Sequence, residues 1–464
     1  MAIPLNERGR NTQCLILGGG PAGLASGWAL QNLGRDYLIL EKSTVHGGNA
    51  RTVQCGEFRY DTGPHRFHAR NPQATQRVME LLGDDLQEVE APARIYWRGK
   101  FVDFPLRPVQ ILKTGGLPYA IGASTDFFMA RLKNRRGVVA EDFATFANAW
   151  FGKTIANSFL IPFSEKLWGL PASKLSPDIA GRRLPGFSIK AMARELLFGS
   201  KKTNHLEGRF LYPKLGYGQI ADRMAERLAE SRLLYQHRVA SIDTRGEDIV
   251  GVGVEVGDET KQFSPETVIN TLPITALVGI MNPRPPKEVL DAAAKLRFRD
   301  VVLVALFLDQ ESISEAAVTY FQVENLDFTR AHEPRNRSRS MSPPGRTSIV
   351  VEYPCFIGDE VWNKDEDRLV GELIQYLEHM GLIDGTNLFG SDVHRLTNAY
   401  PVYSKDYRQS SEIILSYLHR FNNLWSLGRG GGFFYGHVHD FITDGFTAAD
   451  SADSYLLARA TAKV

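Results

Sequence analysis

The sequence predicts an α/β fold built around a Rossmann-type βαβ unit near the N-terminus. Three observations indicate it: short Val/Ile/Leu runs bounded by glycine, helical spacing of apolar residues between these runs, and a glycine-rich loop after the first run. The first run, "CLIL" at 14–17, is followed by "GGGPAG" and an Ala/Leu-rich stretch. This order of strand, glycine loop and helix is typical of a dinucleotide-binding domain.

The loop after the first strand has the spacing G-x-G-x-x-G at Gly18, Gly20 and Gly23. Gly18 allows a tight turn, Gly20 lets the backbone approach a pyrophosphate, and Gly23 lets helix and strand pack closely. The N-terminus of the following helix offers N–H groups and the positive end of its dipole to phosphates. We therefore expect this loop to bind the pyrophosphate of a dinucleotide.

A second strand, "YLIL" at 37–40, follows at βαβ distance and leads directly into Glu41. A carboxylate about 20 residues after the glycine loop can accept hydrogen bonds from ribose hydroxyls. The glycine pair Gly47 and Gly48 comes next and permits a second close backbone approach, although a plain turn would also explain it. A second approach so soon after the acid suits FAD, which extends deeper across the domain than NAD.

The rest of the chain continues the α/β pattern around a long helical stretch. Apolar runs at 268–272 and 301–308 predict further strands, "IADRMAERLAE" at 220–230 has helical spacing, and the stretch 71–204 is mostly helical in periodicity. We predict an FAD-binding domain assembled from separate segments, with a substrate domain of helices and mixed sheet inserted between them. The predicted FAD-binding segments are 12–105, 205–275 and 415–464, and the substrate-binding segments are 106–204 and 276–414.

Composition excludes several classes of partner. The chain has 464 residues, 43% of them hydrophobic, and its net charge of +1 is spread without long blocks, which argues against nucleic-acid binding. The longest apolar run, 301–308, is too short to span a membrane, and the first residues lack the apolar core of a signal peptide. Three cysteines without metal spacing read as reduced thiols. We expect a cytoplasmic protein with a small-molecule substrate, without a nucleic-acid or membrane partner, and leave a homodimer open.

Five longer motifs follow one another along the chain: "LEKSTVHGGNART" with "YDTGPHRFHARN", "GKFVDFPLRP", "IPFSEKLWGLPASKLSP", "LYPKLGYGQIADRM" and "LGRGGGFFYGHVHDF". In this order they resemble the UDP-galactopyranose mutases, within the wider glutathione-reductase-type flavoproteins that include protoporphyrinogen oxidases and flavin amine oxidases. The resemblance implies bound FAD, a helical substrate domain and a six-stranded sheet between the two domains.

Two chemistries are open within this superfamily. In the mutases, flavin N5 attacks the anomeric carbon of UDP-galactose without net redox change, whereas in the oxidases N5 accepts a hydride. The main hypothesis is an FAD enzyme acting on a sugar nucleotide or related glycosyl substrate. The alternative is an oxidase or dehydrogenase of the protoporphyrinogen oxidase and amine oxidase type acting on a cyclic substrate, and a third interpretation is an FAD-binding protein without activity.

The resemblance also implies which side chains lie near the flavin. His65 and His68 match two histidines that lie against the isoalloxazine, where a neutral imidazole could hydrogen-bond the ring or move a proton. Arg429 matches an arginine lining the flavin–sugar site, so His65 and Arg429 are the predicted catalytic residues. The predicted FAD contacts are Gly18, Gly20, Gly23, Glu41, Lys42, Gly47, Gly48, Asn49, Arg51, His65, Val239, Arg429 and Asp440.

The predicted substrate contacts point in two directions. Arg182 and Arg299 fall at or near the places where the mutases bind the diphosphate with arginine, which suits such anions. Phe163 and Phe328, however, replace tyrosines, and a phenyl ring can stack but cannot donate a hydrogen bond. The arginines favour the mutase and the lost hydroxyls favour the oxidase. The complete predicted set is Phe163, Trp168, Arg182, Arg299, Phe328 and Tyr400.

Two further motifs have less specific interpretations. The arginine-rich segment 330–348 predicts an anion-attracting lip, a mobile loop over the site, or a plain solvated loop. His437 and His439 alternate as metal ligands can, but no third ligand stands at a familiar spacing, and we therefore expect no metal site.

Overall fold

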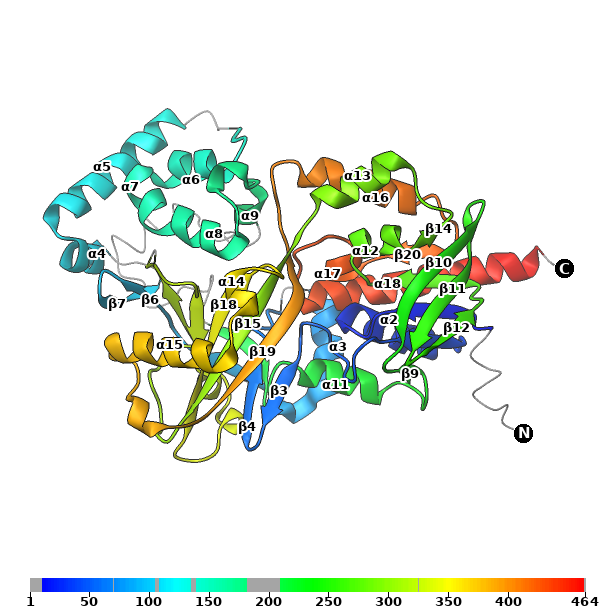
Figure 1. The fold of residues 1–464 in the computed structure, drawn as a ribbon, viewed down its shortest axis with the longest axis horizontal. Helices are drawn as coiled ribbons and strands as arrows, with labels where there is room; N and C mark the ends of the chain where they lie inside the picture. The colour runs from blue at the N-terminus through cyan, green and yellow to red at the C-terminus, as the bar shows by residue number, and fades with distance from the viewer. Residues whose placement is uncertain are drawn as a thin grey trace.

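A five-stranded parallel sheet, in the order β20-β13-β1-β2-β9, forms the centre of one half of the molecule (Figure 1). The structure is a computed structural model that describes residues 11–69, 71–104, 108–134, 139–181, 209–323 and 325–462. The predicted α/β fold is confirmed. The strands of this sheet are β1 (Cys14–Leu17), β2 (Tyr37–Leu40), β9 (Leu233–Leu234), β13 (Thr267–Asn270) and β20 (Leu424–Ser426).

Helix α2 (Pro21–Asn32) follows the glycine loop and is buried from Ala22 to Leu30. The small residues of α2 let the long helix α18 (Val438–Thr461) cross it closely, and this contact helps to bury it. A Cβ on Gly445 of α18 would lie 2.6 Å from the Ala22 carbonyl oxygen. The strand, glycine loop and helix therefore sit inside the protein rather than at its surface. Helices α3 (Pro72–Leu82), α11 (Gln219–Glu226), α12 (Ile274–Gly279), α13 (Lys287–Lys295), α16 (Tyr407–Leu418) and α17 (Gly428–Gly431) complete this half.

A second, seven-stranded sheet has the order β19-β15-β18-β17-β16-β6-β7. The resemblance implied six strands, whereas this sheet has seven; at one edge β6 pairs with β16 in parallel and with β7 in antiparallel. Strands β15 and β18 are buried along their whole lengths, and α15 covers one face with Leu369, Leu373 and Leu377. The elements are β6 (Ala93–Trp97), β7 (Lys100–Phe104), β15 (Phe298–Leu308), β16 (Val318–Phe321), β17 (Arg330–His332), β18 (Thr347–Cys355), β19 (Leu388–Pro401), α14 (Glu360–Asn363) and α15 (Glu366–His379).

A layer of helices lies at one end of this second sheet (Figure 1). It contains α4 (Pro108–Gly115), α5 (Leu117–Lys133), α6 (Phe143–Phe151), α7 (Lys153–Ile155), α8 (Ile161–Trp168) and α9 (Asp178–Gly181). The helical periodicity expected for 71–204 is therefore interrupted by strands, since β5 (Leu86–Glu90) also falls within it. The predicted domain limits stay a prediction. Strands β6 and β7 fall within the first predicted FAD segment, but they are hydrogen-bonded in the seven-stranded sheet.

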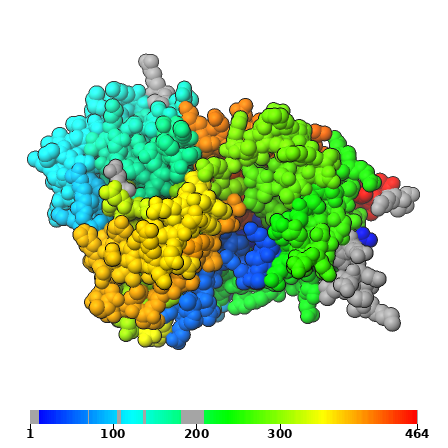
Figure 2. Space-filling view, in the orientation of Figure 1, coloured from blue at the N-terminus to red at the C-terminus, as the bar shows by residue number. Residues whose placement is uncertain are grey.

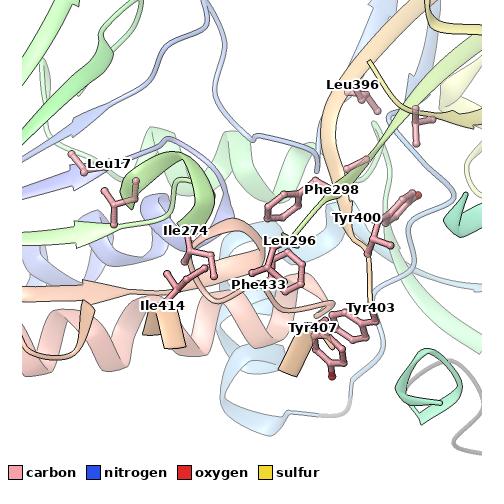
Figure 3. Packing of buried hydrophobic residues seen from close by; sticks show 14 of the residues in the cluster. Leu17, Ile274, Leu296, Phe298, Leu396, Tyr400, Tyr403, Tyr407, Ile414 and Phe433 are labelled. Carbon is pink, nitrogen blue, oxygen red and sulfur yellow. The ribbon is translucent and has the colours of Figure 1, made fainter. Parts of the chain in front are cut away.

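Smaller strands connect the two halves. Strand β3 (Thr52–Cys55) pairs with β4 (Phe58–Asp61), and β5 pairs with β8 (Arg209–Pro213). Strands β10 (Arg238–Arg245), β11 (Asp248–Val256), β12 (Glu259–Phe263) and β14 (Met281–Asn282) form a four-stranded sheet beside the parallel one. A shared core then joins the sheets, in which the rings of Tyr403 and Tyr407 stack 4.0 Å apart near Phe433 (Figure 3).

The arginine-rich segment 330–348 is not a solvated loop. Its first residues form β17 between β16 and β18, and Arg330, His332 and Arg337 are all buried. Glu333 is buried as well and accepts hydrogen bonds from the backbone N–H groups of Ile313 and Ser314. Arg330 and Glu333 serve internal pairing, whereas Arg339 is exposed and Arg346 pairs with Asp309 at the surface. In the described part of the chain, no helix combines the length and apolarity needed to cross a bilayer.

Candidate active site

A large cavity of about 1370 Å³ extends from the glycine loop of the parallel sheet to the helical layer. This volume exceeds the roughly 300–1,000 Å³ of a typical small-ligand pocket. Its walls come from both halves of the molecule: Gly18, Gly20 to Ala22, Glu41 to Ser43 and Gly428 to Gly430 at one end, and α4 to α9 at the other. The cavity therefore has room for a dinucleotide and a second ligand. The molecular surface around these elements is shown in Figure 2.

The glycine loop is shaped as the sequence predicted. Gly18 has φ +106°, and a Cβ there would lie 2.3 Å from Thr271 Oγ1. A Cβ on Gly23 would lie 2.0 Å from the carbonyl oxygen of Gly18, so helix and loop touch through the backbone. Gly20 differs, because its missing Cβ would meet only the Cα of Gly48, at 3.9 Å, and the residue lines the cavity. Gly20 thus leaves space that a ligand can fill.

Glu41 joins the loop to the second strand. Its Oε2 accepts a hydrogen bond from the N–H of Gly19 (2.9 Å), and its Oε1 accepts from the N–H and hydroxyl of Ser43, both at 2.8 Å. The carboxylate is buried but lines the cavity. It can therefore order the glycine loop and still face a ribose.

The second glycine pair lies against the first loop. The N–H of Gly47 donates to the carbonyl of Gly19 (2.8 Å), and a Cβ on Gly48 would lie 3.3 Å from the Cα of Gly20. Beyond it, Asn49 Nδ2 donates to the carbonyl of Asn398 (3.1 Å), and Arg51 Nη2 donates to His394 Nε2 (3.1 Å). The buried Nε of Arg51 has no partner among the described residues and belongs to a residue lining the cavity.

These features fit FAD. Two glycine loops in close contact, a carboxylate at the ribose position and an arginine Nε without a protein acceptor suit a dinucleotide that continues past its pyrophosphate. Most predicted FAD contacts line the cavity: Gly18, Gly20, Glu41, Lys42, Gly48, Asn49, Arg51, His65, Val239 and Arg429. Gly23, Gly47 and Asp440 lie outside its lining, and the Asp440 carboxylate accepts from the N–H of His437 (2.8 Å) at the start of α18.

His65 stacks on Tyr217 in the middle of the cavity wall, with ring centroids 4.9 Å apart. Its Nε2 lies 3.1 Å from the carbonyl oxygen of Asn49, which can only accept, so Nε2 carries the proton and Nδ1 is the acceptor. Burial and then three arginines lower the pKa of His65 from 6.5 to about 3. These arginines are Arg429, Arg337 and Arg330. His65 is therefore neutral at physiological pH.

The depressed pKa of His65 predicts a loss of stability in acid. Below pH 6.5 the imidazole takes up a proton in the unfolded chain, but in the folded chain it does so only near pH 3, so stability falls as pH drops through this window. We expect His65→Gln to flatten the decline in melting temperature between pH 6.5 and 4. His419→Gln, at an exposed histidine, is the matched control and should follow the wild-type curve. An unchanged slope in His65→Gln would contradict the buried, neutral imidazole.

Arg429 is held at the C-terminal glycine motif, where it also lines the cavity. Its Nη1 donates to the carbonyl of Ala399 (2.9 Å) and its Nη2 to that of Gly436 (3.2 Å). The guanidinium lies 5.8 Å from the ring of Tyr400 and 5.5 Å from that of Tyr435. Arg429 is thus a fixed cation beside the aromatic wall formed by Tyr400 and Tyr435.

The far end of the cavity is an apolar chamber. Its helical lining between residues 109 and 180 consists of Val109, Ile111, Ala120, Ala123, Ser124, Phe127, Phe143, Phe151, Ile155, Phe159, Leu160, Phe163, Ser164, Leu167, Trp168, Ile179 and Ala180. None of these described residues is charged. Of the predicted substrate contacts, Phe163, Trp168 and Tyr400 line the cavity together.

Two other predicted substrate contacts lie elsewhere. Arg299 is buried outside the cavity lining, where its guanidinium donates to the carbonyls of Leu167 and Pro354, at 3.2 and 2.8 Å. Phe328 is fully buried in the core beside α15, with its ring 4.9 Å from that of Phe321. Arg299 thus joins its strand to the end of α8, whereas the Phe328 ring packs in the core, and neither side chain lines the cavity. Arg182 lies outside the described residues.

Arg330 is a cavity residue that sequence analysis did not single out. Its Nε donates to Glu352 Oε2 (2.7 Å) on the neighbouring strand, and its Nη2 donates to the hydroxyl oxygen of Tyr400 (2.8 Å). Glu352 keeps the pKa of Arg330 above its usual value in spite of burial. Arg330 thereby fixes the phenol of Tyr400 at the cavity wall. Its only signal in the sequence was the density of arginines in 330–348.

Comparisons with known proteins agree with this geometry. The chain matches the family described as flavin containing amine oxidoreductase over residues 21–437. It is 24% identical over 412 residues to protoporphyrinogen oxidase 1, chloroplastic, of Arabidopsis thaliana, covering 80% of this chain and 74% of that protein. The fold resembles reduced UDP-galactopyranose mutase with a TM-score of 0.81 at 19% identity, covering 95% of each chain. A putative protoporphyrinogen oxidase from Exiguobacterium sp. 255-15 has a TM-score of 0.73 at 17% identity, covering 95% and 98%.

Proposed function

Because the chain belongs to the flavin containing amine oxidoreductase family and is an FAD enzyme, we propose that it oxidises an apolar substrate held in the chamber beside the flavin. The observation that carries this proposal is the lining of the chamber. Its described helical residues offer apolar and aromatic surface and two serine hydroxyls, but no charge. Such a wall favours a hydrocarbon or heteroaromatic ring over a diphosphate, whose desolvation requires cations.

Residues of the protein supply binding and orientation in this proposal. Gly18, Gly20, Glu41 and Arg51 would hold the dinucleotide, which supplies the hydride acceptor when bound. His65 presents Nδ1 as a neutral hydrogen-bond acceptor, and the proton leaving the substrate passes to solvent. The substrate loses a hydride and a proton in the reaction, two electrons in all.

The proposal is tested by narrowing the chamber. Ala120 lines it from α5, and Ala120→Phe adds a ring to the space where we expect the substrate to bind. We expect kcat/KM for a substrate that the enzyme oxidises to fall about 10- to 100-fold, because the added ring displaces the substrate from its position next to the flavin. The FAD content of the variant should equal that of the wild type. Thr125→Phe adds the same ring to the exposed side of the same helix and serves as the control. Equal kinetics for the two variants would contradict the proposal.

A second candidate is the sugar-nucleotide mutase activity that the five motifs imply. It is favoured by Trp168, Tyr400 and Arg429, which line one cavity and combine aromatic surface, a phenol and a cation. For this activity, turnover of UDP- or dTDP-sugars should require reduced flavin and leave the flavin spectrum unchanged at the end. Turnover with reduced flavin alone would replace the first proposal by the second.

A further inference from the structure

Helices α4 and α5 expose an unusual amount of apolar surface. Seven of the eighteen large apolar side chains that are exposed in the described chain lie between residues 109 and 132. We call these seven the α4–α5 face; they are Val109, Leu112, Leu117, Ile121, Phe128, Met129 and Leu132. Scattered single apolar side chains are normal on a protein surface, but a contiguous group indicates a contact site.

The exposed side chains of α5 share one side of the helix. Leu117, Ile121, Phe128 and Leu132 are separated by four, seven and four residues, so they form one stripe along it. Ile121 is 55% and Phe128 63% exposed. The stripe faces away from the protein, because other residues of α5 line the chamber and α5 forms the outer edge of the helical layer in Figure 1. The helix is thus apolar on two sides.

The charges of these two helices have one sign at the surface. Lys113 and Lys133 are exposed at the C-terminal ends of α4 and α5, next to Leu112 and Leu132. The one acidic residue in the two helices, Asp126, is directed at α7, where its Oδ2 accepts from the N–H (3.0 Å) and hydroxyl (2.6 Å) of Thr154. An apolar stripe flanked by exposed lysines is complementary to an anionic lipid headgroup layer over hydrocarbon.

We propose that the α4–α5 face docks on the surface of an anionic lipid bilayer, with its apolar side chains at the boundary of headgroups and acyl chains. The expectation of no membrane partner was drawn from the short apolar runs and from the absence of a polybasic block. A surface-docked helix needs neither a membrane span nor a long block of charge. Val109 belongs both to the face and to the chamber lining. Docking would therefore leave only α4 and α5 between the chamber and the lipid. An apolar substrate could then pass from the lipid to the chamber, and this passage alone rests on the proposed function.

Flotation of the full, FAD-loaded protein with lipid vesicles tests the docking without any substrate. We expect the wild type to float with vesicles of phosphatidylcholine and phosphatidylglycerol, and much less with phosphatidylcholine alone or at high salt. Ile121→Ser combined with Phe128→Ser should lower the bound fraction at least about tenfold, because two large side chains lose their transfer into lipid. The result is independent of whether any substrate is oxidised.

The matched control changes two equally exposed apolar residues elsewhere. Ile357 and Leu457 are 61% and 53% exposed, and the double serine variant at these positions should float as the wild type does. The proposal would be overturned if both double variants lost vesicle binding equally, or if the wild type did not bind anionic vesicles. So would a wild type that is dimeric in lipid-free sedimentation, stays unbound by vesicles and becomes monomeric in Ile121→Ser/Phe128→Ser, since a second copy would then cover the face.

Discussion

Gly20→Val is expected to abolish FAD binding while leaving the fold intact. Gly20 lines the cavity in an extended conformation (φ −78°, ψ 179°), which valine adopts without strain. Its Cβ would meet only the Cα of Gly48, at 3.9 Å, so the Cβ itself displaces no protein atom. The added methyl groups would instead occupy the space we assign to the pyrophosphate. We expect FAD affinity to fall at least about 100-fold, or roughly 3 kcal/mol.

The measurement is the flavin content of the purified protein, with FAD titration of the apoprotein and its circular dichroism spectrum. Gly279→Val is the control, because a Cβ at Gly279 would meet nothing within 4 Å and the residue is exposed outside the cavity. Gly23→Val is the contrasting case, since its Cβ would lie 2.0 Å from the Gly18 oxygen and should disrupt the fold as well. Wild-type FAD affinity in Gly20→Val would refute the assignment of this loop.

Arg330→Met is expected to cause the largest loss of stability. Glu352 is fully buried and faces Arg330 across paired strands, and its other carboxylate oxygen has no partner among the described residues. Removing the arginine leaves that carboxylate in the interior without a cation and frees the hydroxyl of Tyr400 from its donor. Breaking a buried pair in this way costs about 3–5 kcal/mol.

Urea unfolding at saturating FAD measures this effect. The double variant Arg330→Met/Glu352→Gln should recover most of the lost stability, because a neutral amide replaces the uncompensated charge. Arg346→Met is the control, since Arg346 pairs with Asp309 at the surface and should change stability by less than about 1 kcal/mol. A single variant Arg330→Met as stable as the wild type would show that Glu352 does not depend on this arginine.

The local parts of the fold could be predicted from the sequence because their signals are short-range. The strand at 14–17, the glycine loop and the strand before Glu41 lie within about 30 residues, and their periodicity and glycine spacing determine their geometry. The predicted FAD contacts that line the cavity come mostly from this unit and its neighbour at Gly48 to Arg51. FAD as the cofactor is confirmed by the family.

The substrate end could not be predicted in the same way, because it depends on the pairing of distant strands. Arg299 and Arg330 are both arginines on buried strands, but β15 turns Arg299 toward the carbonyls at the end of α8, whereas β17 brings Arg330 to the cavity. Phe163 and Phe328 show the same contrast, one lining the chamber and the other buried in the core. For the two arginines the side-chain direction follows from strand register. For the two phenylalanines it follows from the packing of α8 and of the loop before β17, and residue type encodes neither.

The most direct measurement of the central claim is the absorbance of oxidised flavin after anaerobic mixing of the wild-type protein with a panel of apolar cyclic donors and, separately, of UDP- and dTDP-sugars. The account predicts bleaching by at least one apolar donor, with stoichiometric formation of its oxidised product, and none by the sugar nucleotides. Persistent oxidised flavin with every apolar donor, together with interconversion of a sugar nucleotide after dithionite reduction, would contradict it.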